Sequence, residues 1–555
     1  MATGSHALAL ARRHQDGLIL SFIVAVHLVT LLAWLHTDQA DMMRVPDDFA
    51  HYWCLSNLHA AMALDPWVGT LNGMRVLGSN YPLVAQLPRA VAGLIFGPSP
   101  EVFRLANMMY LVVLLLSVYQ IGRRLHGRRA GLLAAALVSL TPAAYGGMRS
   151  FGLDFPVMCL TALAVLALTR VDGFRSLRAA MVFGVCAGLA MLAKGQSALF
   201  LIWPAAWVLG RALWQGRLAR GAALWRPLAG GAAAVLTVLA TTAVWWLGRL
   251  GELTSIMGAH TSGDGMLEVA GDITLFGGLI HYAQALPMVL SAPLALATVL
   301  ALRAFLRSAR RPWLILIWLV VPLVLHVVLS VRHPRYIFPL VPAAALVLAV
   351  GLCSLGRPWR DRATAAVGLL AVAAWIACST VAPPRVPRHC GALCYVHKDL
   401  WDDPKPARLS DLLDSALTCG SCEYAGRPSA PKPQGVHAQA ARLVQALREQ
   451  SPPDGRGLLV YTDGDYRGVQ SMVLVRRALP DLLFMDVLLV PDLLPTKPAH
   501  RRRALVLWDV ARESPDAGAQ RISLGLRVTL EPSMSLDVHL YRLDPRSGWP
   551  HTSTP

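Results

Sequence analysis

Eleven apolar segments divide the first 383 residues of the chain. A helix needs roughly 20 apolar residues to span the hydrocarbon core of a bilayer. The sequence is 55% hydrophobic and 15% charged, whereas soluble domains average about 25% charged residues. These features predict a polytopic, mainly α-helical membrane bundle. The expected spans are 18–36, 101–122, 129–147, 152–169, 178–193, 197–214, 227–249, 281–302, 312–331, 335–356 and 363–383.

Arginines collect in every second connection between these segments. Because Lys and Arg concentrate in cytoplasmic loops, this alternation predicts a cytoplasmic N-terminus and an outside C-terminus. The first span lacks a small-residue cleavage site and is expected to be retained. The net charge of +18 is then partly a topology signal and does not indicate nucleic acid. The arginines concerned are Arg123, Arg124, Arg128, Arg129, Arg170, Arg175, Arg178, Arg211, Arg217, Arg220, Arg226, Arg303, Arg307, Arg310, Arg311, Arg357, Arg360 and Arg362.

Two adjacent carboxylates, Asp47 and Asp48, follow the first span in the sequence Arg-Val-Pro-Asp-Asp. The predicted topology places them on the outer side of the membrane. A carboxylate beside a second carboxylate in a partly dry site is expected to have a raised pKa. The pair therefore suggests acid–base chemistry at the outer surface of the bilayer.

Several cations depart from the inside bias because they fall in short outer connections. Each one alone could extend to the lipid headgroups, but together they could form a pocket for an anion such as a lipid phosphate. Asp154 begins a span, where an ionisable side chain is costly and usually functional; the alternative is a helix N-terminal cap. The outer cations are Arg149, Lys194, Arg332, His333 and Arg335.

Two outer loops are longer than hairpins require. The loop 37–100 contains apolar stretches interrupted by Arg89, which predicts interfacial helices along the membrane. The loop 250–280 carries His260 among several acidic residues. This second loop is either a lid over the site or a solvated connection.

An ordered set of short motifs resembles a known family. The acidic pair is followed by Tyr81-Pro82-Leu83, Phe103-Arg104-Leu105, Gly152-Leu153-Asp154-Phe155-Pro156, Met191-Leu192-Ala193-Lys194-Gly195 and Arg335-Tyr336-Ile337-Phe338-Pro339-Leu340. Over about residues 15–355 this order is similar to that of GT-C fold, polyprenyl-phosphate-dependent glycosyltransferases. The closest resemblance is to protein mannosyltransferases and aminoarabinose transferases.

The resemblance implies a donor made of a sugar on a polyprenyl phosphate, with transfer on the non-cytoplasmic side. It implies that Asp47 is the catalytic carboxylate. Family members usually have Asp-Glu, so Asp48 departs conservatively from the pattern. Many also have Lys immediately before a Pro-Pro-Leu sequence, where this chain has Asn80-Tyr81-Pro82-Leu83. Lys194 or Arg335 would then have to contact the donor phosphate.

The residue types suit this chemistry. Displacing a phosphate from an anomeric carbon needs a base for the acceptor proton and cations for the leaving phosphate. Asp47 is the expected base, with Asp48 beside it and Asp154 orienting the acceptor or tuning Asp47. The expected substrate-binding residues are His51, Tyr52, Tyr81, Arg104, Arg149, Lys194, His260, Arg332, His333, Arg335 and Tyr336.

Some of these residues have alternative roles. Tyr52 and Tyr336 could stack on a sugar or lie in the interfacial aromatic belt. His51 stands four residues after Asp47, which is the spacing of one helix face, and is a candidate ligand for a divalent metal. No cofactor is otherwise indicated.

After residue 383 the chain has no further spanning segment. Residues 1–383 are therefore expected to form the membrane domain and residues 384–555 a soluble extracytoplasmic α/β domain. Strands are expected at 457–462, 484–490, 504–508 and 521–529, with helices near 437–449 and 466–478.

Four cysteines mark this C-terminal domain: Cys390, Cys394, Cys419 and Cys422. In an oxidising compartment they would form disulfides. Their spacing also suits zinc, and a redox role for the Cys-Gly-Ser-Cys sequence is the third alternative.

The sequence shows no Walker loop and no Rossmann glycine fingerprint. This argues against a nucleotide-driven pump or a nucleotide-sugar donor site and fits a lipid-linked donor. The richness in Ala, Arg and Leu favours a bacterial cytoplasmic membrane. The alternatives are a transporter or flippase of a lipid-linked glycan, which would show an internal repeat, and an envelope scaffold. The sugar and the acceptor (protein, lipid A or another envelope glycan) are left open.

Overall fold

The computed structural model describes residues 2–36, 46–76, 82–218, 224–246, 275–308, 312–329, 333–380, 445, 458–461, 483–486, 504–509, 520–531 and 534–542. The chain divides into two compact units. The first contains residues 1–36 and 107–429, and the second contains residues 37–106 and 430–555.

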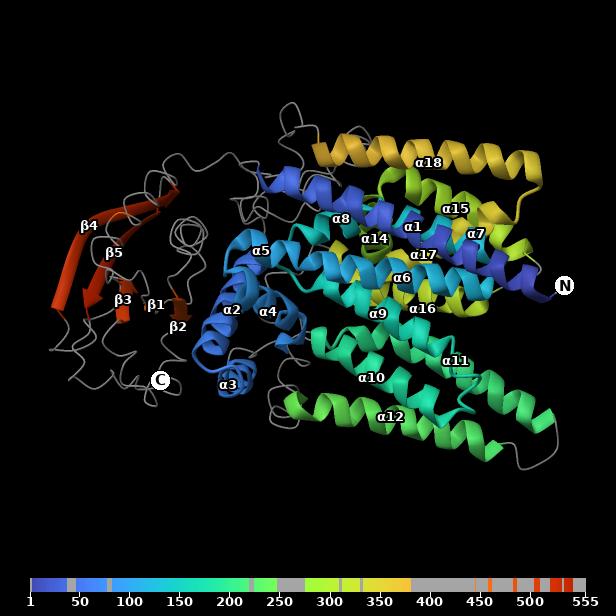
Figure 1. Ribbon diagram of the computed structural model, residues 1–555, viewed down its shortest axis with the longest axis horizontal. Coiled ribbons are helices and arrows are strands. Elements are labelled where there is room, and N and C mark those ends of the chain that lie inside the picture. The colour runs from blue at the N-terminus through green and yellow to red at the C-terminus, as the bar shows by residue number, and fades with distance from the viewer. Residues whose placement is uncertain are drawn as a thin grey trace. The chain divides into compact units, whose positions relative to one another are not determined.

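The described elements of the first unit are helical, and most of its helices run along a common direction (Figure 1). They are α1 (Ala2–Leu35), α6 (Asn107–Leu125), α7 (Arg128–Ser139), α8 (Pro142–Met148), α9 (Asp154–Leu168), α10 (Leu177–Ala193), α11 (Ser197–Leu218), α12 (Trp225–Trp246), α14 (Leu275–Leu290), α15 (Ala292–Arg307), α16 (Trp313–Val328), the 3₁₀ helix η5 (Pro334–Leu340), α17 (Val341–Cys353) and α18 (Arg357–Thr380).

The centre of this unit is α17, which contacts α7, α15 and α16. Its residues from Val341 to Leu352 are all buried, as expected for a helix that is apolar on every side. Peripheral helices instead expose large aliphatic side chains, such as Leu236 on α12 and Leu369 on α18. Such exposure suits contact with lipid, because the bilayer core is itself apolar.

Every predicted span falls on a helix. Among the residues that the structure describes, five helical segments are long and apolar enough to cross a membrane, and two bent pairs could add two more spans. The five are His14–Leu35, Pro100–Leu125, Ser197–Gln215, Trp225–Ala243 and Pro334–Cys353. Three further predicted spans correspond to the shorter apolar helices α9, α10 and α16. The total of eleven spans stays a prediction.

Two predicted spans are bent in the structure. The segment predicted at 129–147 consists of α7 and α8, which meet at 56°, and Pro142 begins the second helix. The segment predicted at 281–302 consists of α14 and α15, which meet at 111°. Ser291 between them has a φ of 72°, so the helical path cannot continue through it.

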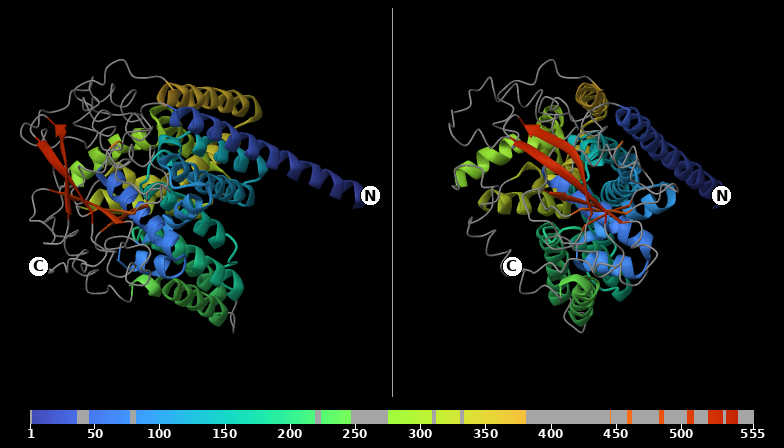
Figure 2. Two further views of the ribbon diagram at one scale, coloured as in Figure 1. Left: turned by 60° about the vertical axis from the view of Figure 1, so that its left-hand side comes forward. Right: turned by 90° about the vertical axis from the view of Figure 1, so that its left-hand side faces the viewer.

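Ion pairs join helices at the arginine-rich end of the bundle. Arg128 pairs with Asp16 of α1, and Arg129 pairs with Asp361 of α18 at 2.7 Å. Helices α1 and α18 lie side by side in all views (Figures 1 and 2), and the rings of His27 and Trp375 meet there at 5.7 Å. Two arginines of the predicted inner connections, Arg128 and Arg129, therefore pair with carboxylates of neighbouring helices.

The second unit combines short helices and strands. Its helices are α2 (Pro46–Leu64), α3 (Val68–Val76), η2 (Leu83–Ala85), α4 (Leu87–Phe96) and α5 (Pro100–Leu105). Its strands are β1 (Leu458–Tyr461), β2 (Leu483–Asp486), β3 (Ala504–Asp509), β4 (Gln520–Glu531) and β5 (Met534–Arg542). The described parts of the loop 37–100 are therefore largely helical, and their position along the membrane surface stays a prediction.

The five strands form one mixed sheet in the order β2-β1-β3-β5-β4. Strand β1 pairs in parallel with β2 and β3, whereas β5 pairs antiparallel with β3 and β4. Parallel neighbours require long crossover connections, which is consistent with the predicted α/β class. The predicted helices near 437–449 and 466–478 lie outside the described residues except at position 445.

Helices α15 and α17 cross so closely that adding one methyl group at Gly351 is expected to destabilise the fold. A Cβ atom added at Gly351 would lie 2.5 Å from the carbonyl oxygen of Ala301, whereas one at Gly210 on α11 would meet nothing within 4 Å. Gly351→Ala is expected to lower the unfolding free energy by about 1–3 kcal/mol through overpacking. Thermal unfolding of the detergent-solubilised protein measures this change.

Gly210→Ala is the matched control, because alanine is favoured over glycine in a helix by about 1 kcal/mol. It is expected to leave the melting temperature unchanged or to raise it slightly. Equal melting temperatures for the two variants would contradict the close crossing of α15 and α17.

Candidate functional site

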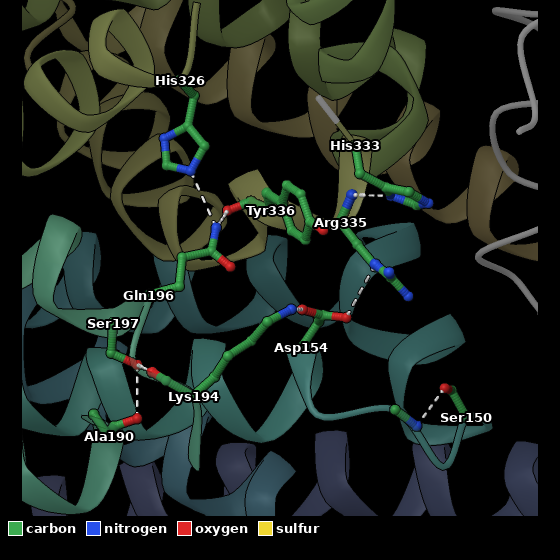
Figure 3. A network of polar contacts seen from close by, with 11 residues as sticks. Ser150, Asp154, Ala190, Lys194, Gln196, Ser197, His326, His333, Arg335 and Tyr336 are labelled. Carbon is green, nitrogen blue, oxygen red and sulfur yellow. Dashed lines mark hydrogen bonds and ion pairs between the residues drawn. The ribbon is translucent and has the colours of Figure 1, made fainter. Parts of the chain in front are cut away.

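An ion pair joins two of the sequence-predicted residues. Asp154 is the first residue of α9, where the positive end of the helix dipole favours a carboxylate. Lys194 caps the C-terminus of α10, and its Nζ atom lies 2.8 Å from Oδ1 of Asp154. The side chains are only 9% and 13% exposed. Figure 3 shows the two side chains pointing at each other.

Arg335 of η5 is the second cation at this carboxylate. Its Nε atom lies 3.8 Å from Oδ2 of Asp154, and its side chain is 11% exposed. Two cations thus contact one carboxylate. Partly buried cations attract an anion more strongly than solvated cations do.

The ring of Tyr336 lies beside both cations. Its centroid is 4.8 Å from Nζ of Lys194 and 5.6 Å from Cζ of Arg335. A cation near an aromatic face gains attraction without losing its charge. Tyr336 therefore lies against both cations and restricts the directions in which they can turn.

His333 contributes a neutral side chain to the cluster. Its Nδ1 atom accepts a hydrogen bond from the backbone N–H of Arg335 at 3.2 Å, which fixes the start of η5. Burial lowers the pKa of His333 well below its usual value, and the charges of Arg335, Lys194 and His281 lower this pKa further. His333 is therefore uncharged near neutral pH.

This shift predicts a pH dependence of stability. A histidine whose pKa is lowered by folding stabilises the folded state above its unfolded pKa of about 6.5, and this stability is lost as the pH falls below that value. His333→Asn retains an acceptor near the position of Nδ1 and cannot be protonated. It is expected to lose less melting temperature than the wild type between pH 7.5 and pH 5.5.

The matched control is His14→Asn, because His14 is exposed on α1. Its loss of melting temperature on acidification is expected to equal that of the wild type. A His333→Asn variant that is as acid-sensitive as the wild type would contradict a neutral, buried His333.

A second set of side chains holds η5 against α11 and α16. The Nε2 group of Gln196 donates to the carbonyl oxygen of Tyr336 at 3.0 Å and contacts Nε2 of His326 at 3.1 Å. Nδ1 of His326 lies 2.7 Å from the carbonyl oxygen of Pro322. Since a carbonyl only accepts, Nδ1 carries the proton and Nε2 accepts from Gln196.

Asn107 holds the loop that precedes Asp154. Its Nδ2 group donates to the carbonyl oxygens of Met148 and Ser150, and the Ser150 hydroxyl accepts from the backbone N–H of Gly152 at 2.8 Å. The side chain of Asn107 is fully buried. This network sets the position at which α9, and therefore Asp154, begins.

The sequence reasoning missed Gln196, His326 and Asn107 as positioning residues. His326 had a usable signal, because an ionisable side chain inside an apolar segment is by default a functional candidate. Gln196 stands two residues after Lys194 in the same turn. Asn107 has no comparable signal, because its partners are backbone carbonyls about 40 residues away in sequence.

Arg149 belongs to an aromatic cluster. Its guanidinium lies 5.3 Å from the ring of Trp34 on α1 and 5.8 Å from the ring of Tyr145 on α8. The residue is only 4% exposed. These contacts describe a cation stacked between helices of the bundle, and its predicted role in binding substrate stays a prediction.

Several predicted site residues belong to the second unit. Asp47 and Asp48 lie in the first turn of α2, and their side chains are outside the described residues. Tyr52 is buried, with its ring 6.3 Å from that of Phe103. Arg104 on α5 is also buried, whereas His51 is partly exposed. Their roles in substrate binding stay predictions.

The remaining predicted residues lie outside the described part of the chain: Tyr81, His260, Arg332, Cys390, Cys394, Cys419 and Cys422. Among the residues that the structure describes, no three His, Cys, Asp or Glu side chains are grouped to hold a metal ion. The candidate metal site at His51 and the alternatives for the cysteines therefore stay predictions.

Comparisons with known proteins connect this geometry with a family and a fold. Residues 80–246 match the family described as dolichyl-phosphate-mannose-protein mannosyltransferase. The chain is similar to the crystal structure of ArnT from Cupriavidus metallidurans bound to undecaprenyl phosphate, at a TM-score of 0.54 and 16% identity. The similarity covers 94% of this chain and 97% of that chain.

The chain has a GT-C fold. The same ArnT in the apo state gives a TM-score of 0.51 at 16% identity, covering 88% of this chain and 93% of that chain. A search of curated proteins found no match. The predicted resemblance and the predicted helical membrane bundle are confirmed, and the chain is a multi-pass membrane protein. The extracytoplasmic C-terminal α/β domain stays a prediction.

Proposed function

We propose that the chain is a glycosyltransferase that takes a sugar from a polyprenyl-phosphate donor. It transfers the sugar, with inversion, to an acceptor on the outer side of a bacterial cytoplasmic membrane. The observation that carries this proposal is that Lys194 and Arg335 converge on Asp154 in a GT-C fold. The family match over residues 80–246 includes Asp154 and Lys194 and supports it.

The cluster suits the departure of a phosphate. As the bond between the anomeric carbon and the phosphate oxygen breaks, its electron pair stays on that oxygen, and the phosphate charge changes from −1 to −2. Lys194 and Arg335 stabilise this second negative charge as it develops. Asp154 holds both cations in position, and Tyr336 limits the directions in which they can turn.

The acceptor needs a base. Its hydroxyl oxygen forms the new bond to the anomeric carbon, and its proton passes to the carboxylate of Asp47. Attack on the face opposite the phosphate inverts the anomeric centre in a single displacement. Asp48 is assigned to the same acidic site.

ArnT was crystallised with undecaprenyl phosphate, and this carrier suits the cluster as the part of the donor that holds the sugar and, after transfer, as the product. It presents a phosphate at the membrane surface, where a site at the ends of membrane helices can meet it. The acceptor classes to compare are protein hydroxyls, lipid A and other envelope glycans.

The test uses the purified full-length chain with undecaprenyl-phosphate-linked sugars and each acceptor class. Release of undecaprenyl phosphate together with a glycosylated acceptor is the expected result. Failure with every donor, combined with movement of a lipid-linked glycan across vesicles containing the protein, would favour a flippase instead.

A further inference from the structure

A second charged site lies between α15 and α17. A cavity of 970 Å³ opens there, lined by Arg303 and Arg307 of α15, by His126 and by the connection 353–356. Its volume is within the range of roughly 300–1,000 Å³ that ligand sites occupy. Gly351 and Ala301, where α17 and α15 approach closely, stand two residues before Cys353 and Arg303 of the cavity wall.

This cavity is separate from the Asp154 cluster. Helix α17 begins directly after η5, which carries Arg335, and ends at Cys353 in the cavity wall. Thirteen helical residues span about 20 Å at 1.5 Å per residue. The two sites therefore stand at opposite ends of the same buried helix, and the cavity is at the arginine-rich end.

The two arginines of the cavity differ from their neighbours at that end. Arg128 and Arg129 are each paired with a carboxylate, Asp16 and Asp361. Among the described residues, no acidic side chain forms an ion pair with Arg303 or Arg307. These two guanidinium groups stand one helical turn apart on α15, so both can face a single anion.

An apolar stripe continues from the arginines along α15. Leu296, Val299 and Leu300 are 62%, 65% and 69% exposed, and their spacing places them on the helix face of Arg303 and Arg307. A ligand that covered both parts would need an anionic group and a long apolar chain.

We infer that this cavity binds the headgroup phosphate of an anionic phospholipid, whose acyl chain lies along Leu296, Val299 and Leu300. Basic pockets between membrane helices at the cytoplasmic side are suited to such headgroups. A free phosphate ion could contact the same two arginines, but it has no apolar chain to cover the apolar stripe. The site is independent of the sugar-transfer proposal.

Native mass spectrometry of the delipidated full-length protein tests this inference. Phosphatidylglycerol is expected to bind in preference to phosphatidylcholine. The double substitution Arg303→Gln/Arg307→Gln is expected to weaken phosphatidylglycerol binding roughly tenfold or more, which corresponds to about 1.4 kcal/mol. Leu300→Asn is expected to weaken lipid binding while leaving any binding of inorganic phosphate unchanged.

The matched control is Arg211→Gln/Arg362→Gln, which removes the same charge from exposed arginines outside the cavity. Its phosphatidylglycerol binding is expected to equal that of the wild type. An equal loss in both double variants would overturn the site, because it would show general surface attraction. Displacement of phosphatidylglycerol by inorganic phosphate at comparable concentration would also overturn it, in favour of a soluble phosphate site.

Discussion

Asp47→Asn is expected to reduce sugar transfer by about 10²–10⁴-fold, which is the usual contribution of a general base. The amide has nearly the size of the carboxylate but cannot accept the acceptor's proton. Donor binding is expected to persist, because the cations at Asp154 are unchanged. The measurement is single-turnover transfer from an undecaprenyl-phosphate-linked sugar to the acceptor identified with the wild type.

Asp48→Asn provides the comparison within the same acidic pair. Its rate is expected to fall less than that of Asp47→Asn, because Asp48 does not receive the proton. Equal turnover by Asp47→Asn and the wild type would remove Asp47 from its assigned role. If Asp48→Asn were the more severe variant, the base would be Asp48.

Lys194→Gln is expected to lower the rate of transfer by about 10²–10³-fold, similar to the loss of one donor to a developing oxyanion. The substitution removes the cation at 2.8 Å from Asp154 and leaves Arg335 at 3.8 Å. It is also expected to destabilise the fold, because the partly buried Asp154 then lacks its nearest partner. Transfer rate and melting temperature are measured on the same preparation.

A double variant separates these two effects. Lys194→Gln/Asp154→Asn removes both members of the ion pair, and replacing both partners is often nearly neutral for stability. Its melting temperature is expected to recover toward that of the wild type, while its transfer rate stays low. Recovery of the rate along with the stability would show that the pair is only structural.

The sequence predicted the bundle well because the bilayer restricts what an apolar chain can form. Segments of sufficient length had to become helices, and each of them is helical in the structure. The bend at Ser291 was not predicted, because it depends on a single residue with a φ of 72°. No periodicity in the surrounding apolar sequence marks such a residue.

The cluster of Asp154, Lys194 and Arg335 was predictable in part. Topology from the arginine-rich connections placed all three at the same side of the membrane, so their meeting was a reasonable hypothesis. Their distances were not predictable, because they depend on how α9, α10 and η5 pack. The same reason explains why the contact of Gln196 with Tyr336, 140 residues later in the chain, was missed.

The C-terminal sheet was also predictable only in part. Four strands were predicted near their observed positions, whereas β5 was missed although Leu536, Val538 and Leu540 alternate with polar or amphipathic residues. The strand order β2-β1-β3-β5-β4 could not be derived from spacing alone. Which parallel strands become neighbours depends on the path of the crossover connections between them.

The most direct test of the central claim compares the binding of undecaprenyl phosphate and undecaprenol to the full-length protein. These lipids share the chain and differ in the phosphate, so the difference in affinity measures recognition of the anion. The wild type is expected to prefer undecaprenyl phosphate, and Lys194→Gln/Arg335→Gln is expected to lose that preference. An unchanged preference in this variant would contradict the claim that Lys194 and Arg335 receive the donor phosphate.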